Sequence, residues 1–219
     1  MPNYLFFIIF IFICYLLGST PTSIITGRII KGIDIRDHGS GNAGGTNVFR
    51  ILGWKPGLFV IIIDILKGWI PVAILAPKFY LFGPISDLGV VQIISGFAAV
   101  LGHTYTIFAK FKGGKGVGTL GGMIIALFPT VFPFCLLIAI ITLIMTGYVS
   151  LASIIASCSL PILLLVIPPF LNVYPAPLSI MIFSLLIPWF IIYTHRSNIQ
   201  RIRNGDENQF KKAMFFRKD

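Results

Sequence analysis

The feature of this chain that most constrains its fold is a series of apolar stretches. Runs of about 18 or more nearly uncharged apolar residues recur along the 219 residues, and a helix of that length can cross a lipid bilayer. Only 11% of the residues are charged, against about 25% in a soluble domain. We therefore expect an all-α, polytopic integral membrane protein with one membrane domain over residues 1–219.

The apolar stretches divide into about seven predicted transmembrane helices. Residues 116–169 hold either three short helices or two long ones, and turn signals near 129–133 and 147–150 favour three. No basic region precedes the first apolar stretch, so we expect it to be a retained span and not a cleaved signal peptide. Residues 18–22 predict a bend inside this span. The expected ranges are 4–26, 56–77, 90–109, 116–130, 132–148, 152–169 and 176–194.

Basic residues predict the orientation. The net charge of +10 would suggest nucleic acid in a soluble protein, but here the basic residues lie between spans, so we expect no nucleic-acid partner. With the N-terminus outside, 15 of the 17 Lys and Arg residues fall inside, including Lys211, Lys212, Arg217 and Lys218. Only Lys78 falls outside, and Lys67 lies within a span. This bias predicts a cytoplasmic C-terminus by the positive-inside rule.

Glycines and small polar residues gather in residues 36–50, on the predicted inside face. Gly39, Gly41 and Gly44 match GxGxxG, but no strand precedes them, so the context of a Rossmann site is missing. Glycines permit positive φ, and successive N–H groups can then surround an anion. A flexible loop is the alternative. We favour a phosphate site, because the same stretch holds several donor side chains: Ser40, Asn42, Thr46, Asn47 and Arg50.

A second glycine-rich segment surrounds Lys115. Gly113, Gly114 and Gly116 flank this lysine at the predicted start of a helix, where N–H groups and the helix dipole attract phosphate. Lys112 lies just before them. The segment therefore predicts a second phosphate contact.

The same segment does not fit a nucleotide P-loop. Ala109 occupies the place of the glycine that opens a Walker A loop, and no Ser or Thr follows Lys115. Gly118 and Gly122 form GxxxG, which favours close contact between helices. Helix packing and phosphate binding are compatible interpretations of these glycines.

Three polar residues lie inside predicted spans. Asp64 and Lys67 are three residues apart, so they can neutralise each other on one helix face. We expect a structural ion pair, with a share in the functional site as the alternative. His103 lies within or at the end of a span, where a polar group is costly unless it is paired. It is either functional or hydrogen-bonded for structure.

The polar tail begins directly after the last predicted span. His195 and Asn198 are three apart and share a face if the helix continues. Arg201 and Arg203 follow, and a basic segment that binds anionic lipid is the alternative interpretation.

Together these segments resemble the bacterial acyl-phosphate glycerol-3-phosphate acyltransferases of the PlsY type. The matching stretches begin at Gly39, Asp64, Gly102, Phe111 and His195, and their order covers nearly the whole chain. The chain departs from the family pattern at three positions, which are Gly45 in place of Ala, Thr106 in place of Pro and Gly147 in place of Arg.

The resemblance implies transfer of an acyl group from acyl phosphate to glycerol 3-phosphate, giving lysophosphatidate and inorganic phosphate in phospholipid biosynthesis. It also implies a multi-pass protein of the bacterial cytoplasmic (inner) membrane, with lipid around it and the active site facing the cytoplasm. The implied catalytic residues are Ser40, Arg50, Lys115, His195 and Asn198. The expected phosphate-binding residues are Gly39, Gly41, Asn42, Thr46, Asn47, Lys112, Gly113, Gly114, Gly116 and Ser153.

The residue types favour a reaction without a covalent enzyme intermediate. None of the three histidines has an Asp five positions on, and no Ser-His-Asp order stands out. We expect direct attack of the glycerol 3-phosphate hydroxyl on the acyl carbon, with no metal and no cofactor. The rival hypothesis is a membrane transporter for a phosphate-bearing anion.

Overall fold

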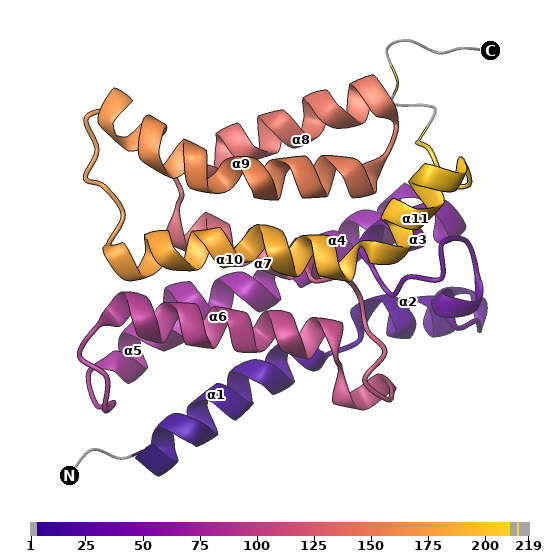
Figure 1. Cartoon of the computed structure of the whole chain (residues 1–219). Helices are drawn as coiled ribbons and strands as arrows, with labels where there is room; N and C mark the ends of the chain where they lie inside the picture. Colours follow the sequence, from indigo (N-terminus) through magenta and orange to yellow (C-terminus); the bar gives the residue numbers. More distant parts are fainter. Residues whose placement is uncertain (1–3, 211–213, 215–219) are drawn as a thin grey trace. The chain divides into compact units, whose positions relative to one another are not determined.

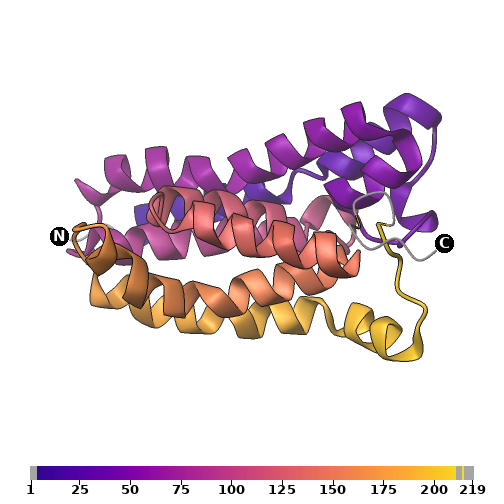
Figure 2. The ribbon, with the colours of Figure 1, turned by 90° about the horizontal axis from the view of Figure 1, so that it is seen from above.

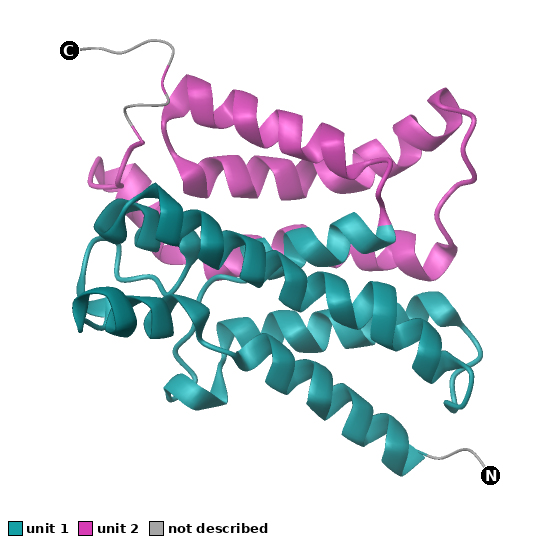
Figure 3. Ribbon diagram, turned by 180° about the vertical axis from the view of Figure 1, so that it is seen from behind, with its two compact units in different colours: residues 1–127 teal, residues 128–219 magenta. Residues whose placement is uncertain are grey.

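The computed structural model describes residues 4–210 and 214, and every regular element within them is a helix. This confirms the all-α prediction. The chain forms two compact units, residues 1–127 and residues 128–219 (Figure 3). The single membrane domain over 1–219 stays a prediction. Lys211, Lys212, Arg217 and Lys218, which contribute to the predicted orientation, lie outside the described residues.

The first unit begins with two helices that are separated by a short break, and it continues through loops to α7 (Figure 1). Its elements are α1 (Tyr4–Ser19), α2 (Thr22–Lys31), η1 (Ile35–Asp37), α3 (Gly45–Leu52), α4 (Trp54–Ile70), the π-helical η2 (Pro71–Leu75), α5 (Ala76–Tyr80), α6 (Leu88–Thr104), η3 (Ile107–Ala109) and α7 (Val117–Leu127).

The second unit contains α8 (Phe132–Thr146), α9 (Val149–Phe170), α10 (Leu178–Thr194) and α11 (Arg196–Asn204). Helix α9 packs against both α8 and α10 (Figure 2). Helices α10 and α11 meet at an angle of 57°, so the helix does not continue straight through His195 as the shared-face argument assumed.

Four segments in the described part of the chain are long and apolar enough to cross a membrane: Tyr4–Lys31, Trp54–Tyr80, Leu88–Ala109 and Val149–Phe170. A fifth results if α10 and α11 form one broken span. Helices occur over all seven predicted ranges, and residues 116–169 hold three of them. However, α7 and α8 have only 11 and 15 residues, which is short for a span. The number of crossings and the orientation stay predictions.

Prolines lie at two irregular points of the long helices of the first unit. The chain leaves the helical path at Thr20 and Pro21, within the predicted bend. Proline has no N–H to donate and its ring crowds the preceding turn. Pro71 lies inside the second long segment, where the helix widens to a π-helical turn instead of ending.

Glycines permit the closest helix crossings. A Cβ at Gly18 on α1 would collide with the Ala99 carbonyl group of α6, and one at Gly122 on α7 would collide with the Ile65 carbonyl group of α4. Figure 1 shows α1 running beside α6. Small residues let backbones approach in this way inside membranes. The predicted packing role of Gly118 and Gly122 is confirmed, since Gly118 lies against Asp64 of α4.

Candidate functional site

The side chain of Asn47 organises the first glycine-rich loop. Its Oδ1 accepts the Ser40 N–H at 2.9 Å, and its Nδ2 donates to the carbonyl oxygens of Ile35 and His38, both at 2.9 Å. Asn47 lies on α3 and is only 1% exposed. These bonds use both amide hydrogens, and all of them go to backbone groups of residues 35–40. Asn47 therefore holds the conformation of the loop in this structure.

The glycines of this loop hold conformations that other residues avoid. Gly39 and Gly41 have φ of +61° and +70°, in the left-handed region that favours glycine. A Cβ at Gly39 would also collide with Asn47 Oδ1. The loop therefore needs glycine at position 39 for both backbone angle and space.

The loop ends at the N-terminus of α3, where the N-cap is Gly44 and no side chain caps the helix. The first N–H groups of a helix have no partner within it, and the helix dipole favours an anion beside them. Thr46 lies in this first turn, and Arg50 lies in the last turn of the same helix. Ser40, Asn42, Thr46 and Arg50 are all partly exposed, so an anion could reach them.

The second glycine-rich segment folds back onto the end of α6. The N–H groups of Gly113 and Gly114 donate to the carbonyl oxygens of Thr104 and His103, at 3.0 and 3.1 Å. These two N–H groups therefore bind α6 in this structure, which explains the glycines by packing. Gly116 has φ of +81°, and α7 begins at the next residue. Lys115 is thus placed before a helix start, as predicted, and is half-buried.

The two glycine-rich segments lie next to each other within the first unit. Arg36 donates from Nη1 to the carbonyl oxygens of Ala109 and Lys112, both at 3.2 Å. Arg36 is held in turn by Asp34 at 2.7 Å. A Cβ at Gly114 would lie 2.8 Å from the Ala43 carbonyl oxygen. Sequence spacing alone did not indicate that Arg36 connects the two segments.

This contact changes the acidity of Asp34. The hydrogen bond from Arg36 lowers the pKa of the Asp34 carboxyl group to about 2 from its ordinary 3.8. The same bond raises the pKa of Arg36. Hydrogen bonding and opposite charge both favour the ionised form. Asp34 therefore remains ionised at neutral pH and keeps Arg36 oriented toward the second segment.

In the second unit, His195 occupies the bend between α10 and α11. It is 3% exposed, and its Nδ1 lies 2.8 Å from the Ile191 carbonyl oxygen. A carbonyl oxygen only accepts, so this contact places a proton on Nδ1. In the neutral ring the lone pair then lies on Nε2, and this tautomer can accept a proton at Nε2.

Glu207 gathers three side chains of the second unit. Its Oε1 accepts from Asn198 at 2.6 Å and from Ser150 at 2.9 Å, and its Oε2 accepts from Arg201 at 2.7 Å. Ser153 instead donates to the Val149 carbonyl oxygen at 2.9 Å and is half-buried. Sequence reasoning missed Glu207, although Asn198 and Arg201 are three apart on a helix and could have indicated a common acceptor.

The surroundings of Glu207 also shift its acidity. Burial raises the pKa of the carboxyl group, but the hydrogen bonds from Asn198, Arg201 and Ser150 lower it by more, and the net pKa is below the ordinary value. The ionised carboxylate is thus the form that the three donors stabilise.

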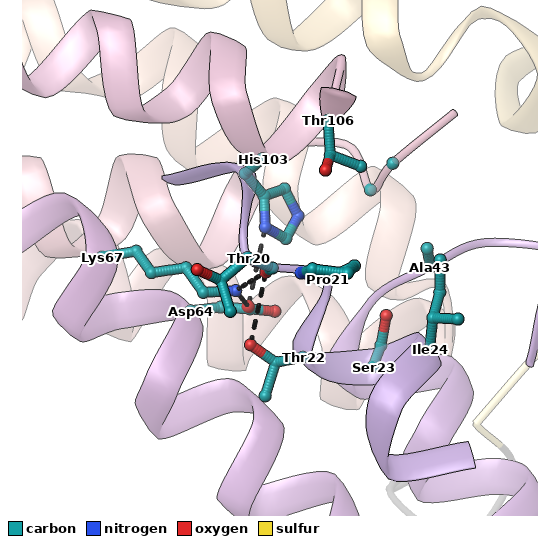
Figure 4. A pocket seen from close by; sticks show the side chains of 12 residues that line it. Thr20, Pro21, Thr22, Ser23, Ile24, Ala43, Asp64, Lys67, His103 and Thr106 are labelled. Atoms are coloured by element: carbon teal, nitrogen blue, oxygen red, sulfur yellow. Dashed lines mark hydrogen bonds and ion pairs between the residues drawn. The ribbon is translucent and has the colours of Figure 1, made fainter. Parts of the chain in front are cut away.

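The predicted ion pair between Asp64 and Lys67 is confirmed. Lys67 Nζ lies 2.8 Å from Asp64 Oδ1, and both residues are 4% exposed. Lys67 also donates to the Thr20 carbonyl oxygen at 2.6 Å. His103 Nδ1 lies 3.6 Å from the same Asp64 oxygen (Figure 4).

Across the described residues, His, Cys, Asp and Glu nowhere gather in a group of three that could hold a metal ion.

A family model described as "Glycerol-3-phosphate acyltransferase" matches residues 8–205. A glycerol-3-phosphate acyltransferase of Chlorobium phaeobacteroides (strain BS1) is 41% identical, over 93% of this chain and 96% of the relative. A protein of the same name from Chlorobaculum parvum is 42% identical, again over 93% and 96%.

Two solved structures resemble this one along most of the chain. Both are crystal structures of PlsY (YgiH), described as an integral membrane glycerol 3-phosphate acyltransferase, one in its lysphosphatidic acid form and one in its glycerol 3-phosphate form. Each is 38% identical with a TM-score of 0.77 and matches 93% of this chain. The matches cover 94% and 95% of the PlsY chains.

Proposed function

This chain belongs to the glycerol-3-phosphate acyltransferase family, and from that premise we propose that its acyl donor is an acyl phosphate. The protein is a multi-pass membrane acyltransferase. It transfers an acyl group to glycerol 3-phosphate and forms lysophosphatidate for phospholipid synthesis. We place it in the bacterial cytoplasmic (inner) membrane with its active site toward the cytoplasm, because the basic residues gather in the segments that would face that side.

One observation carries the proposal for how substrate binds. Two glycine-rich segments lie side by side, and each leads into the N-terminus of a helix. Lys115 lies directly before α7, and Arg50 lies in the last turn of the short helix α3. Helix N-termini and cations together favour phosphate, and both substrates carry it. Arg50 suits phosphate through its planar fork of donors.

The proposed reaction is a direct transfer. The hydroxyl oxygen of glycerol 3-phosphate forms a bond to the acyl carbon, and the bond from that carbon to the phosphate oxygen breaks. Inorganic phosphate leaves with the bonding electrons, and the hydroxyl proton passes either to a substrate phosphate or to His195. The protein contributes by holding both substrates and by stabilising charge that develops in the transition state, a role for Lys115 and Arg50. Ser40 is proposed to contact a reacting group.

Residues of the second unit have proposed roles in the same reaction. Asn198 can donate a hydrogen bond to a phosphate, and its position is held by Glu207. His195, with its proton on Nδ1, either orients a neighbour or accepts a proton through Nε2. Ser153 is proposed to bind phosphate. Its hydroxyl group donates to the Val149 carbonyl oxygen in this structure. Phosphate binding would replace that hydrogen bond by one to a phosphate oxygen.

The test uses purified protein in detergent with acyl phosphate and glycerol 3-phosphate, and it follows phosphate release and lysophosphatidate together. Equal formation of both products, with turnover strongly reduced in Lys115→Ala and Arg50→Ala, would support the donor and the two cations. Near-normal turnover in both variants would rule out their roles. Absence of turnover with intact donor and folded protein would rule out acyl phosphate and favour another donor.

His195 needs a separate comparison. If it is the proton acceptor, His195→Ala loses most of the rate across the pH range. If it orients a neighbour, His195→Ala loses less, and the product ratio stays one to one.

A further inference from the structure

A buried polar cluster of Asp64, Lys67 and His103 takes no part in the proposed reaction. These residues are 4%, 4% and 8% exposed. Ionisable groups inside a membrane are costly and persist where they have partners and a use. Asp64 contacts both Lys67 and His103, and each of these two residues contacts a part of the chain next to one of the glycine-rich segments.

The first chain of contacts runs through Lys67. Its ammonium group joins Asp64 Oδ1, at 2.8 Å, to the carbonyl oxygen of Thr20, at 2.6 Å. Thr20 lies at the break between α1 and α2, and α2 leads through η1 into the loop that Asn47 shapes. Figure 4 shows the Lys67 side chain extended toward Asp64 and Thr20. Lys67 therefore holds the start of α2, the helix that precedes the first glycine-rich segment.

The second chain of contacts runs through His103. Its Nδ1 faces Asp64 Oδ1 at 3.6 Å, and its backbone carbonyl oxygen accepts the Gly114 N–H at 3.1 Å. The ring also lies against Gly114, because a Cβ there would collide with His103 Nε2. His103 therefore contacts Gly114 through both its ring and its backbone, and Lys115 is the next residue.

The residues of both chains of contacts line one narrow pocket. Its lining includes Asp64, Lys67 and His103, together with Ala43 of the first glycine-rich segment and Gly114 of the second. Figure 4 shows that Asp64, Lys67 and His103 point toward one another, with Thr20 and Pro21 next to them.

We propose that Asp64 is a positioning residue for the acyl transfer. Through Lys67 and His103 it holds the two glycine-rich segments in the arrangement that places Lys115 at the substrate phosphate. The inference rests on the proposed function, since it assigns Lys115 to substrate.

A purely structural ion pair predicts a different result from a positioning cluster. Replacing a buried pair by apolar side chains of similar shape is often neutral or stabilising, whereas removing one partner leaves an unpaired buried charge. Leucine has the branching of aspartate, and methionine follows the path of the lysine stem. The double variant Asp64→Leu/Lys67→Met therefore separates an effect on protein stability from an effect on the placement of Lys115.

The experiment measures the melting temperature in detergent, kcat, and KM for each substrate. The controls are Lys115→Ala and Ile62→Ala, since Ile62 lies on the same helix and is 47% exposed. We expect the double variant to melt near the wild type. We also expect about a tenfold rise in KM, equivalent to about 1.4 kcal/mol, for the substrate whose KM rises in Lys115→Ala. Ile62→Ala should match the wild type.

Normal KM values for both substrates in a stably folded double variant would overturn the proposal. If that variant does not fold, His103→Leu and His103→Asn replace it, because Asn keeps a nitrogen donor near the place of Nδ1 whereas Leu does not. A raised KM in His103→Leu that His103→Asn partly restores supports positioning, and equal, normal values in both variants overturn it.

A second measurement separates this inference from the proposed donor. Glycerol 3-phosphate should raise the melting temperature of the wild type, and this rise should shrink in the double variant. An unchanged rise would count against the inference even if acyl phosphate is the donor. Lack of turnover with acyl phosphate would refute the donor and leave the ligand-induced rise as the test of positioning.

Discussion

The side-chain amide of Asn198 donates to the Glu207 carboxylate at 2.6 Å, across the turn that follows α11. Arg201 reaches the other carboxylate oxygen at 2.7 Å. Ser150 at the start of α9 binds the first oxygen. A single carboxylate therefore connects the polar tail to α9 and fixes the orientation of a residue proposed to touch substrate.

Replacing Glu207 by Gln should destabilise the protein by about 1.5–3 kcal/mol, the size of a charge-assisted hydrogen bond. The Gln oxygen can still accept from Asn198 and Ser150, but its amide nitrogen would face the Arg201 donor. The melting temperature in detergent should fall. Asp206→Asn is the matched control, because Asp206 is exposed and adjacent. Equal melting temperatures for Glu207→Gln and wild type would contradict the role of the carboxylate.

The same carboxylate predicts a dependence of stability on pH. Its pKa is below the ordinary 4.5 in the folded protein, so its stabilising contribution is complete above about 4.5 and is lost as pH falls through the folded pKa. We expect the melting temperature to decline below about pH 4.5, with a smaller decline in Glu207→Gln. Asp34, with a pKa of about 2 against 3.8, should add a further loss between these values. A curve for Glu207→Gln parallel to that of the wild type would refute the assignment.

Gly39→Ala should impair activity more than Gly32→Ala. Both glycines have similar φ, +61° and +67°, so both substitutions carry a backbone cost of about 1–2 kcal/mol. The Cβ at position 32 meets open space, whereas the one at position 39 collides with Asn47 Oδ1. We expect only Gly39→Ala to disturb the Ser40 backbone and raise KM for a phosphate substrate. Similar kinetics in the two variants would show that the Asn47 contact does not matter.

Gly122→Ala should destabilise the contact between α4 and α7, and Gly121→Ala should not. A Cβ at Gly122 collides with the Ile65 carbonyl oxygen, and one at Gly121 has nothing within 4 Å. Both residues lie inside α7, where Ala is a better helix former than Gly. Gly121→Ala should therefore melt at or above the wild-type temperature, and Gly122→Ala well below it. The reverse order would refute the close crossing.

Gly147 illustrates how the structure explains a departure from the family pattern. This glycine ends α8 with φ of +72°, a left-handed cap that favours Gly over the Arg that the family resemblance led us to expect. A Cβ there would also lie 2.8 Å from the Met214 sulfur. The residue is therefore understandable as a helix terminator, a role that sequence comparison with the family did not suggest.

Periodicity and composition predicted the helices well, because an apolar run in a membrane has few alternatives to helix. The bend near Pro21, the three helices of residues 116–169 and the ion pair of Asp64 and Lys67 all follow from residues close together in the chain. The count of crossings is less determined, since α7 and α8 fall below the usual span length.

The sequence by itself determined that this chain is helical, enters a membrane and carries two glycine-rich polar segments, for which it predicts phosphate binding. Those properties depend on local composition and on spacing within single segments. Only the tertiary structure decided that Arg36 joins the two glycine-rich segments, that Asn47 shapes a loop, and that Glu207 gathers Asn198, Arg201 and Ser150. The bonds of Arg36 to Ala109 and Lys112 and of Ser150 to Glu207 join residues 73, 76 and 57 positions apart. The other bonds close loops and turns over 6 to 12 positions. In both cases the partners are selected by how the chain folds back on itself, and no local pattern encodes that choice.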